Sequence, residues 1–147
     1  MSSLTVLLRI AFFGLVVCAS ACSDIQSRVL EEKKAAEALQ ILRDIRSAET
    51  AFKNRLGRYG TLSELIKAQL VTADLEGGLH ADYRFSVVAA SNTYEVTAIP
   101  ANEREAYRVW SFYLDESGVL RGAAYRRQDN EYRAAGKADQ PLMRERQ

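Results

Sequence analysis

The 147-residue sequence predicts an α+β fold, in which a long N-terminal helix packs on a small antiparallel sheet of about four strands. Two patterns predict it. Apolar residues recur every three or four positions over residues 24–56, as in an amphipathic helix. Short segments of alternating apolar and polar residues then follow between turn-forming residues, as in an antiparallel meander. By length, the chain behind its first 21 residues forms one domain.

Residues 1–21 have the order of a secretory signal peptide, with the basic Arg9, a short apolar run and small residues before Cys22. The apolar run after Arg9 is about 12 residues long, shorter than the roughly 20 that a spanning helix needs. The alternative is an uncleaved membrane anchor, which would place Arg9 inside the span.

The tetrapeptide Ala19-Ser20-Ala21-Cys22 resembles the lipobox of bacterial lipoproteins. The resemblance implies cleavage between Ala21 and Cys22, and acylation of the Cys22 sulfur with a diacylglyceryl group carrying chains such as palmitate. An ordinary export cleavage after Ala21 is the alternative, because Ala19 and Ala21 also fit the A-x-A rule. Cys18 would leave with the signal, so the mature chain would hold no disulfide.

The location and charge of the mature protein follow from this cleavage. Ser23 after the cysteine resembles the pattern of lipoproteins sent to the outer membrane, so we expect a lipid-anchored, periplasm-facing protein there. Loss of Arg9 leaves 19 basic and 19 acidic residues, without the basic excess of a nucleic-acid-binding protein.

Residues 24–56 are predicted to form one helix, because no Pro or Gly interrupts them before Gly57. Charged residues, Glu49 among them, are assigned to the solvated face of this helix. Its first part, up to about Ala38, has few large apolar residues and is expected to project as a stalk. The alternative is an ordinary solvated helix end. The apolar stripe consists of Ile25, Val29, Ala38, Ile41, Ile45, Ala48, Phe52 and Leu56.

The rest of the chain divides at turn signals. A T-x-x-E capping box at Thr61 and Glu64 predicts a second helix as far as Leu70, and it makes Glu64 a cap rather than a catalytic acid. Gly77-Gly78 marks a loop over residues 72–81. Strands are predicted at residues 82–88, 94–98, 108–114 and 119–123. The basic tail, residues 125–147, is expected to be irregular.

Five segments occur in a specific order between residues 35 and 121. They are Ala48-Glu49-Thr50-Ala51-Phe52, Gly57-Arg58-Tyr59-Gly60-Thr61-Leu62, Tyr83-Arg84-Phe85, Tyr94-Glu95-Val96-Thr97-Ala98 and Ser111-Phe112-Tyr113-Leu114-Asp115-Glu116-Ser117-Gly118-Val119-Leu120-Arg121. Together they resemble the globular region of type IV pilin-like proteins and type II secretion pseudopilins. The resemblance implies a pilin-like domain over residues 22–124 and a role in a secretion or pilus system. Unlike those proteins, this chain has no prepilin-peptidase site before a retained apolar helix, so we expect it to lack the filament core.

The sequence offers little for catalysis. His80 is the single histidine, so sites built from several imidazoles are excluded. Asp115 and Glu116 fall in a tight hairpin, where carboxylates usually favour the turn itself. The pseudopilin resemblance implies calcium as an alternative role for these two residues or for Asp74 and Glu76, but the dense D-x-D-x-D-G spacing is missing. We therefore expect no enzymatic activity, no cofactor and no metal.

Trp110 and Tyr113 are the candidate partner surface. They lie on opposite faces of the third predicted strand, and a single helix covers only one face of a sheet. We therefore expect one of the two to be exposed, while most other aromatic residues enter the core.

These observations favour a non-enzymatic, membrane-tethered lipoprotein whose pilin-like domain binds a protein partner in the cell envelope. One alternative is a small-ligand-binding lipoprotein with a pocket between helix and sheet. Another is a divergent pilin or pseudopilin filament subunit.

Overall fold

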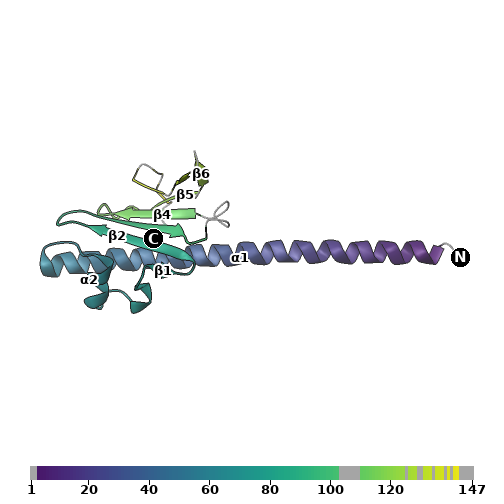
Figure 1. The fold of residues 1–147 in the computed structure, drawn as a ribbon, viewed down its shortest axis with the longest axis horizontal. Coiled ribbons are helices and arrows are strands. Elements are labelled where there is room, and N and C mark those ends of the chain that lie inside the picture. The colour runs from purple at the N-terminus through teal and green to yellow at the C-terminus, as the bar shows by residue number, and fades with distance from the viewer. Residues whose placement is uncertain are drawn as a thin grey trace. The chain divides into compact units, whose positions relative to one another are not determined.

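The computed structural model describes the backbone of residues 3–102, 110–124, 126–128, 131–133, 135–137, 139 and 141–142. It describes the side chains of residues 25–102, 110–123, 135–137, 139 and 141–142. The chain divides into two compact units, Met1–Lys33 and Lys34–Gln147. The fold is α+β, with one long helix and a five-stranded antiparallel sheet (Figure 1).

Helix α1 spans Ser3–Leu56 and includes the whole helix predicted over residues 24–56. In the first unit, the side chains of Ile25, Val29 and Leu30 are all more than half exposed. In the second unit, the middle of the predicted stripe is buried against the sheet at Ala38, Ile45, Ala48 and Phe52, and Leu42 beside the stripe is buried with them. Burial of this face supplies most of the stability of such a helix, because short isolated helices are marginal in water.

Glycine ends α1 and a capping box starts the next helix, both as predicted. Gly57 takes a φ of 75° and donates its N–H to the carbonyl of Lys53 at 2.8 Å. Helix α2, Leu62–Lys67, begins after Thr61, whose hydroxyl accepts from the N–H of Glu64 while the Glu64 carboxylate accepts from the N–H of Thr61.

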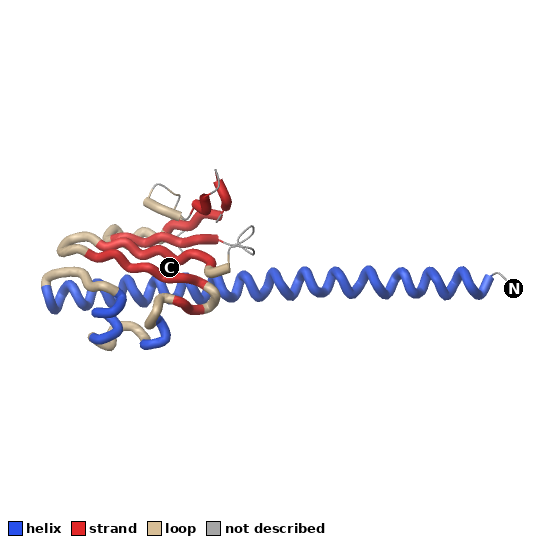
Figure 2. Tube along the Cα trace, in the orientation of Figure 1, coloured by secondary structure: helices blue, strands red, loops and turns tan. Residues whose placement is uncertain are grey.

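The sheet has the strand order β1-β2-β3-β4-β5, and every neighbouring pair is antiparallel. Its strands are β1 (Leu79–His80), β2 (Tyr83–Ala89), β3 (Tyr94–Pro100), β4 (Trp110–Asp115) and β5 (Arg121–Ala124). Figure 2 shows the sheet lying along the C-terminal part of α1 within the second unit. Its inward side chains, among them Phe85, Val96 and Leu114, form one core with α1.

The prediction of about four strands was one too low, because β1 lies in the segment assigned to a loop. Positive φ values at Ala81 and Asp82 form a two-residue turn that reverses the chain and brings Leu79 and His80 beside β2. The same segment contains a 3₁₀ helix, η1 (Ala73–Leu75).

Two strands form within the tail, where the sequence predicted irregular structure. Strands β6 (Arg126–Gln128) and β7 (Glu131–Arg133) pair as a second, two-stranded sheet. Further on, Pro141 forms a bridge with Arg121 of β5, and the N–H of Leu142 donates to the carbonyl of Leu120 at 2.8 Å.

Candidate partner surface

The predicted cleavage and lipidation positions, Ala21 and Cys22, lie within the backbone of α1. Their side chains are outside the described set, so acylation of Cys22 stays a prediction. Within the described residues, no helix has the length and apolar character required to cross a bilayer.

Trp110 is exposed, with 48% of its surface accessible. Its backbone is fixed, because its carbonyl accepts a hydrogen bond of 2.9 Å from the Tyr83 hydroxyl. Its ring lies close above Gly122 of β5, where a Cβ atom would be 3.2 Å from the indole Cε3 and 2.8 Å from Leu142. Glycine at position 122 thus gives the indole and Leu142 the space to pack over β5 while part of the ring faces outward.

Tyr113 is buried, with only 3% of its surface exposed, so of the two predicted aromatics only Trp110 is accessible. The outer face of β4, which holds Ser111 and Tyr113, is not open at Ser111, because Ala135 of the C-terminal segment packs there. Ser111 Oγ accepts a 2.7 Å hydrogen bond from the N–H of Ala135, which is itself buried. Burial, and then the nearby Glu95 carboxylate, raise the pKa of Tyr113 to about 12.

The acidic hairpin builds a turn, as predicted. Asp115 is buried and accepts hydrogen bonds from the N–H of Ser117, at 3.0 Å, and from the Ser117 hydroxyl. Arg121 Nη1 lies 3.9 Å from its second oxygen. Gly118, with a φ of 71°, donates its N–H to the Asp115 carbonyl at 2.9 Å and completes the turn.

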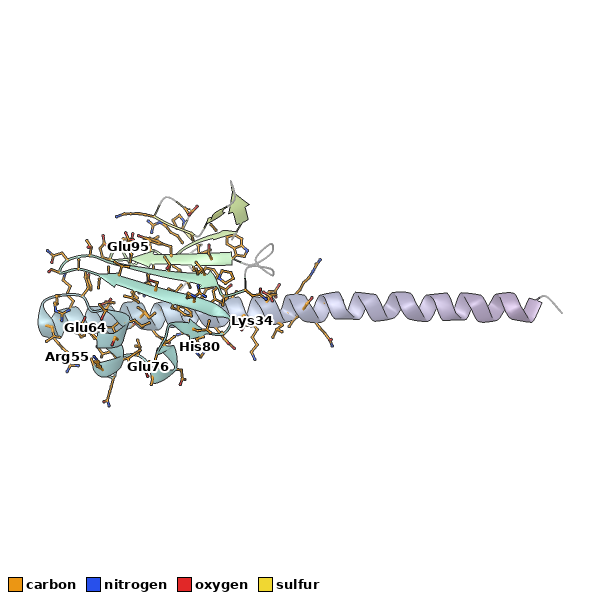
Figure 3. All side chains as sticks on the ribbon, viewed as in Figure 1. Lys34, Arg55, Glu64, Glu76, His80 and Glu95 are labelled. Carbon is orange, nitrogen blue, oxygen red and sulfur yellow. The ribbon has the colours of Figure 1, made fainter. Side chains whose placement is uncertain are left out.

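The other predicted acidic and imidazole groups do not converge. His80 pairs with Tyr83 between β1 and β2, and Glu76 follows η1 (Figure 3). Glu116 lies 4.0 Å from Lys137 Nζ. Among the described residues, no group of three or more His, Cys, Asp or Glu side chains could hold a metal ion.

Sequence reasoning missed Glu49, which was assigned to solvent but is fully buried. Its Oε2 accepts a 2.9 Å hydrogen bond from the N–H of Gly60, while Oε1 has no hydrogen-bond partner among the residues that the structure describes. Burial raises the pKa of Glu49, the Gly60 N–H opposes this effect, and the charge of Glu64 adds to it. The spacing carried the signal, because position 49 is four residues after Ile45 and three before Phe52, on the buried stripe.

Glu64 has the opposite electrostatic environment. Arg58 Nη2 lies 2.6 Å from its Oε1, and the N–H of Thr61 lies 2.9 Å from its Oε2. The Arg58 hydrogen bond, followed by that from Thr61, lowers the pKa of Glu64 to about 2. The carboxylate is thus held charged as a cap.

Two grooves flank α2. One, of about 630 Å³, is lined by Ile41 and Asp44 of α1 and by the segment from Ile66 to Leu75. The other, of about 360 Å³, lies between α2 and β2. The ligand alternative predicted a pocket between the long helix and the sheet, but both of these grooves involve α2 or the residues after it.

The chain matched no family model, no curated protein and no solved structure.

Proposed function

We propose that this protein is a non-enzymatic lipoprotein, tethered to a bacterial envelope membrane through Cys22, whose pilin-like domain binds a protein partner. The observation that carries the proposal is Ala19-Ser20-Ala21-Cys22 directly after a basic residue and an apolar run. We further propose that it serves as an accessory to a secretion or type IV pilus system, which rests on the resemblance of residues 35–121 to pilin-like proteins.

The tether acts by raising the local concentration of the domain at the membrane. A single acyl chain binds a bilayer weakly and reversibly, whereas two or more hold it stably. Diacylglyceryl on Cys22 supplies two chains. The exposed, well-supported Trp110 supports partner binding, because tryptophan on a rigid element is enriched among residues that dominate interface energies.

Cys22→Ser tests the anchor, with Cys18→Ser as the matched control four residues upstream. Intact mass and membrane fractionation in a bacterium that processes lipoproteins are the measurements. Wild type and Cys18→Ser should begin at an acylated Cys22 and sediment with membranes, while Cys22→Ser should carry no lipid. A wild-type chain that still begins at Met1, or carries an unmodified Cys22, contradicts the proposal.

Trp110→Ala tests the partner surface, with Leu56→Ala as a control because Leu56 is 60% exposed and also apolar. Crosslinking in intact cells should give a covalent adduct with the partner. Trp110→Ala should weaken binding of the partner by more than about 1 kcal/mol, roughly fivefold in affinity, so that less adduct forms. The melting temperature should change little. Equal adducts from both variants would place the partner site elsewhere.

A further inference from the structure

We propose that the open edge of β2 docks an extended polypeptide segment of a partner protein, which joins the sheet as an added strand in line with β1. This surface is separate from Trp110, and the inference goes beyond the proposed function.

The backbone N–H and C=O groups of successive β2 residues point alternately to the two sides of the strand, as in any antiparallel ladder. At even positions the strand pairs with β3: the N–H of Ala90 donates to the carbonyl of Thr93 at 2.8 Å, and Asp82 accepts from Ala101 at 2.7 Å. The register between these two bonds means that the backbone groups of Ser86 and Val88 also point towards β3.

Odd positions of β2 point away from β3. The N–H of Phe85 donates to the carbonyl of Gly78 at 2.6 Å, on the β1 side. By the same alternation, Val87 and Ala89 direct their N–H and C=O groups to that side. Among the residues that the structure describes, none pairs with these groups of Val87 or Ala89.

The segment that leads into β1 stops pairing with β2 at Gly78. Positive φ values at Gly77 and Gly78 turn it away, and the N–H of Glu76 bonds to the carbonyl of Ala73 within η1 instead. The strand position next to Val87 and Ala89 is therefore unfilled by β1.

This edge lacks the lysine and proline residues that commonly protect sheet edges. Residues 85–91 contain no charged residue and no proline, and Val88 is 67% exposed. Edge strands normally avoid added strands through lysine, proline, bulges or covering segments. The opposite edge has such cover, because Pro141 bridges to Arg121 of β5.

A groove of about 360 Å³ runs beside the open edge. Phe85, Ser86 and Val87 line one side, and Leu62 and Ile66 of α2 line the other. Because α2 forms the far wall, the groove suits one extended segment better than the edge of a second folded sheet with strands behind it. Strand addition draws affinity from main-chain hydrogen bonds and selectivity from side-chain pockets, so the segment should carry apolar, β-branched residues at alternate positions.

Hydrogen exchange of the full chain in detergent micelles tests this docking, using an end-blocked hexapeptide of alternating threonine and valine as the probe. The peptide should slow exchange at the amides of Val87 and Ala89, which have no partner within the described part of the chain, and leave those of Ser86 and Val88 nearly unchanged. The proposal is overturned if about 1 mM peptide, a concentration that would reveal even weak binding, does not slow amide exchange at Val87 and Ala89.

Variants test the same site by peptide affinity. Ala89→Pro removes an edge-facing N–H and should weaken binding by about tenfold, whereas Val88→Thr on the exposed face should not. If Ala89→Pro misfolds, Ser63→Trp narrows the groove from its α2 wall and should also weaken binding. Trp110→Ala should leave peptide binding unchanged, so failure here is distinct from failure of the proposed function. If two copies of this protein instead pair through the β2 edges and thereby exclude the peptide, the docking of a partner segment is overturned.

Discussion

At the scale of single residues, the buried carboxylate of Glu49 is the least expected feature of the core. Removing a carboxylate from water costs free energy that one backbone hydrogen bond only partly offsets. Gly60 provides that bond, and any other residue there would force the Phe52 ring to shift, because its Cβ would lie 2.9 Å from that ring. Glu49 therefore fixes the segment after α1 at an electrostatic cost.

Glu49→Gln should flatten the pH dependence of stability above about pH 4.3, the ordinary glutamate pKa. The raised pKa means that folded Glu49 binds its proton more tightly than the unfolded chain does, so wild-type stability falls as pH rises through this window. Glu64 and Tyr94 are the titratable groups that face it from other elements. Glutamine keeps an acceptor for Gly60 and should be more stable by about 1 kcal/mol near neutral pH.

Urea denaturation at several pH values measures this effect, with Glu76→Gln as a control at an exposed carboxyl. Glu64 acts in a separate window: its pKa of about 2 means that its contribution is lost as pH falls from about 4.3 towards 2. An unchanged slope above pH 4.3 in Glu49→Gln would refute the assignment.

At the scale of elements, each helix and strand depends on a neighbour to bury its apolar face. The stripe of α1 packs on β2, β3 and β4, while Leu65 of α2 and Leu75 after it complete the same core. From Ser111 to Asp115, strand β4 is buried on both faces, because α1 packs on one face and Ala135 is hydrogen-bonded to Ser111 on the other.

Phe52→Ala should destabilise the protein by about 3 kcal/mol or more, since the ring is 5% exposed and its loss leaves a cavity between α1 and the sheet. Exposed Asn54→Ala, on the same turn, should cost less than about 0.5 kcal/mol. Lys53 is a poorer control, because its Nζ lies 4.3 Å from the Tyr59 ring centre and 3.3 Å from Asn92 Oδ1. Chemical denaturation decides, and equal small effects would mean that α1 does not pack on the sheet.

At the scale of the whole molecule, the chain consists of two units that differ in packing. In Met1–Lys33 the described side chains of Ile25, Val29 and Leu30 are exposed, whereas the second unit holds the hydrophobic core. A helix without tertiary packing is only marginally stable, so the two parts of α1 should open independently.

Hydrogen exchange should show this difference along one helix. Amides of residues 25–33 should exchange faster than those of residues 42–52 by on the order of a hundredfold, because only the latter are held by the core. Mass spectrometry of peptic fragments measures the rates on the full chain in micelles. Uniform protection from residue 25 to residue 56 would contradict the expectation and indicate that another surface covers Ile25 and Val29.

Local sequence patterns determined the helix over residues 24–56, the Thr61 capping box, the alternation of β2 and β3, and the turn before Gly118. Each depends on contacts within a few residues, which spacing and turn chemistry encode directly. Tertiary structure decided the rest: the burial of Glu49, the extra strand β1, and the choice between Trp110 and Tyr113. These depend on residues distant in sequence, because Gly60 bonds Glu49, Gly78 bonds Phe85, and Ala135 covers the face that holds Tyr113.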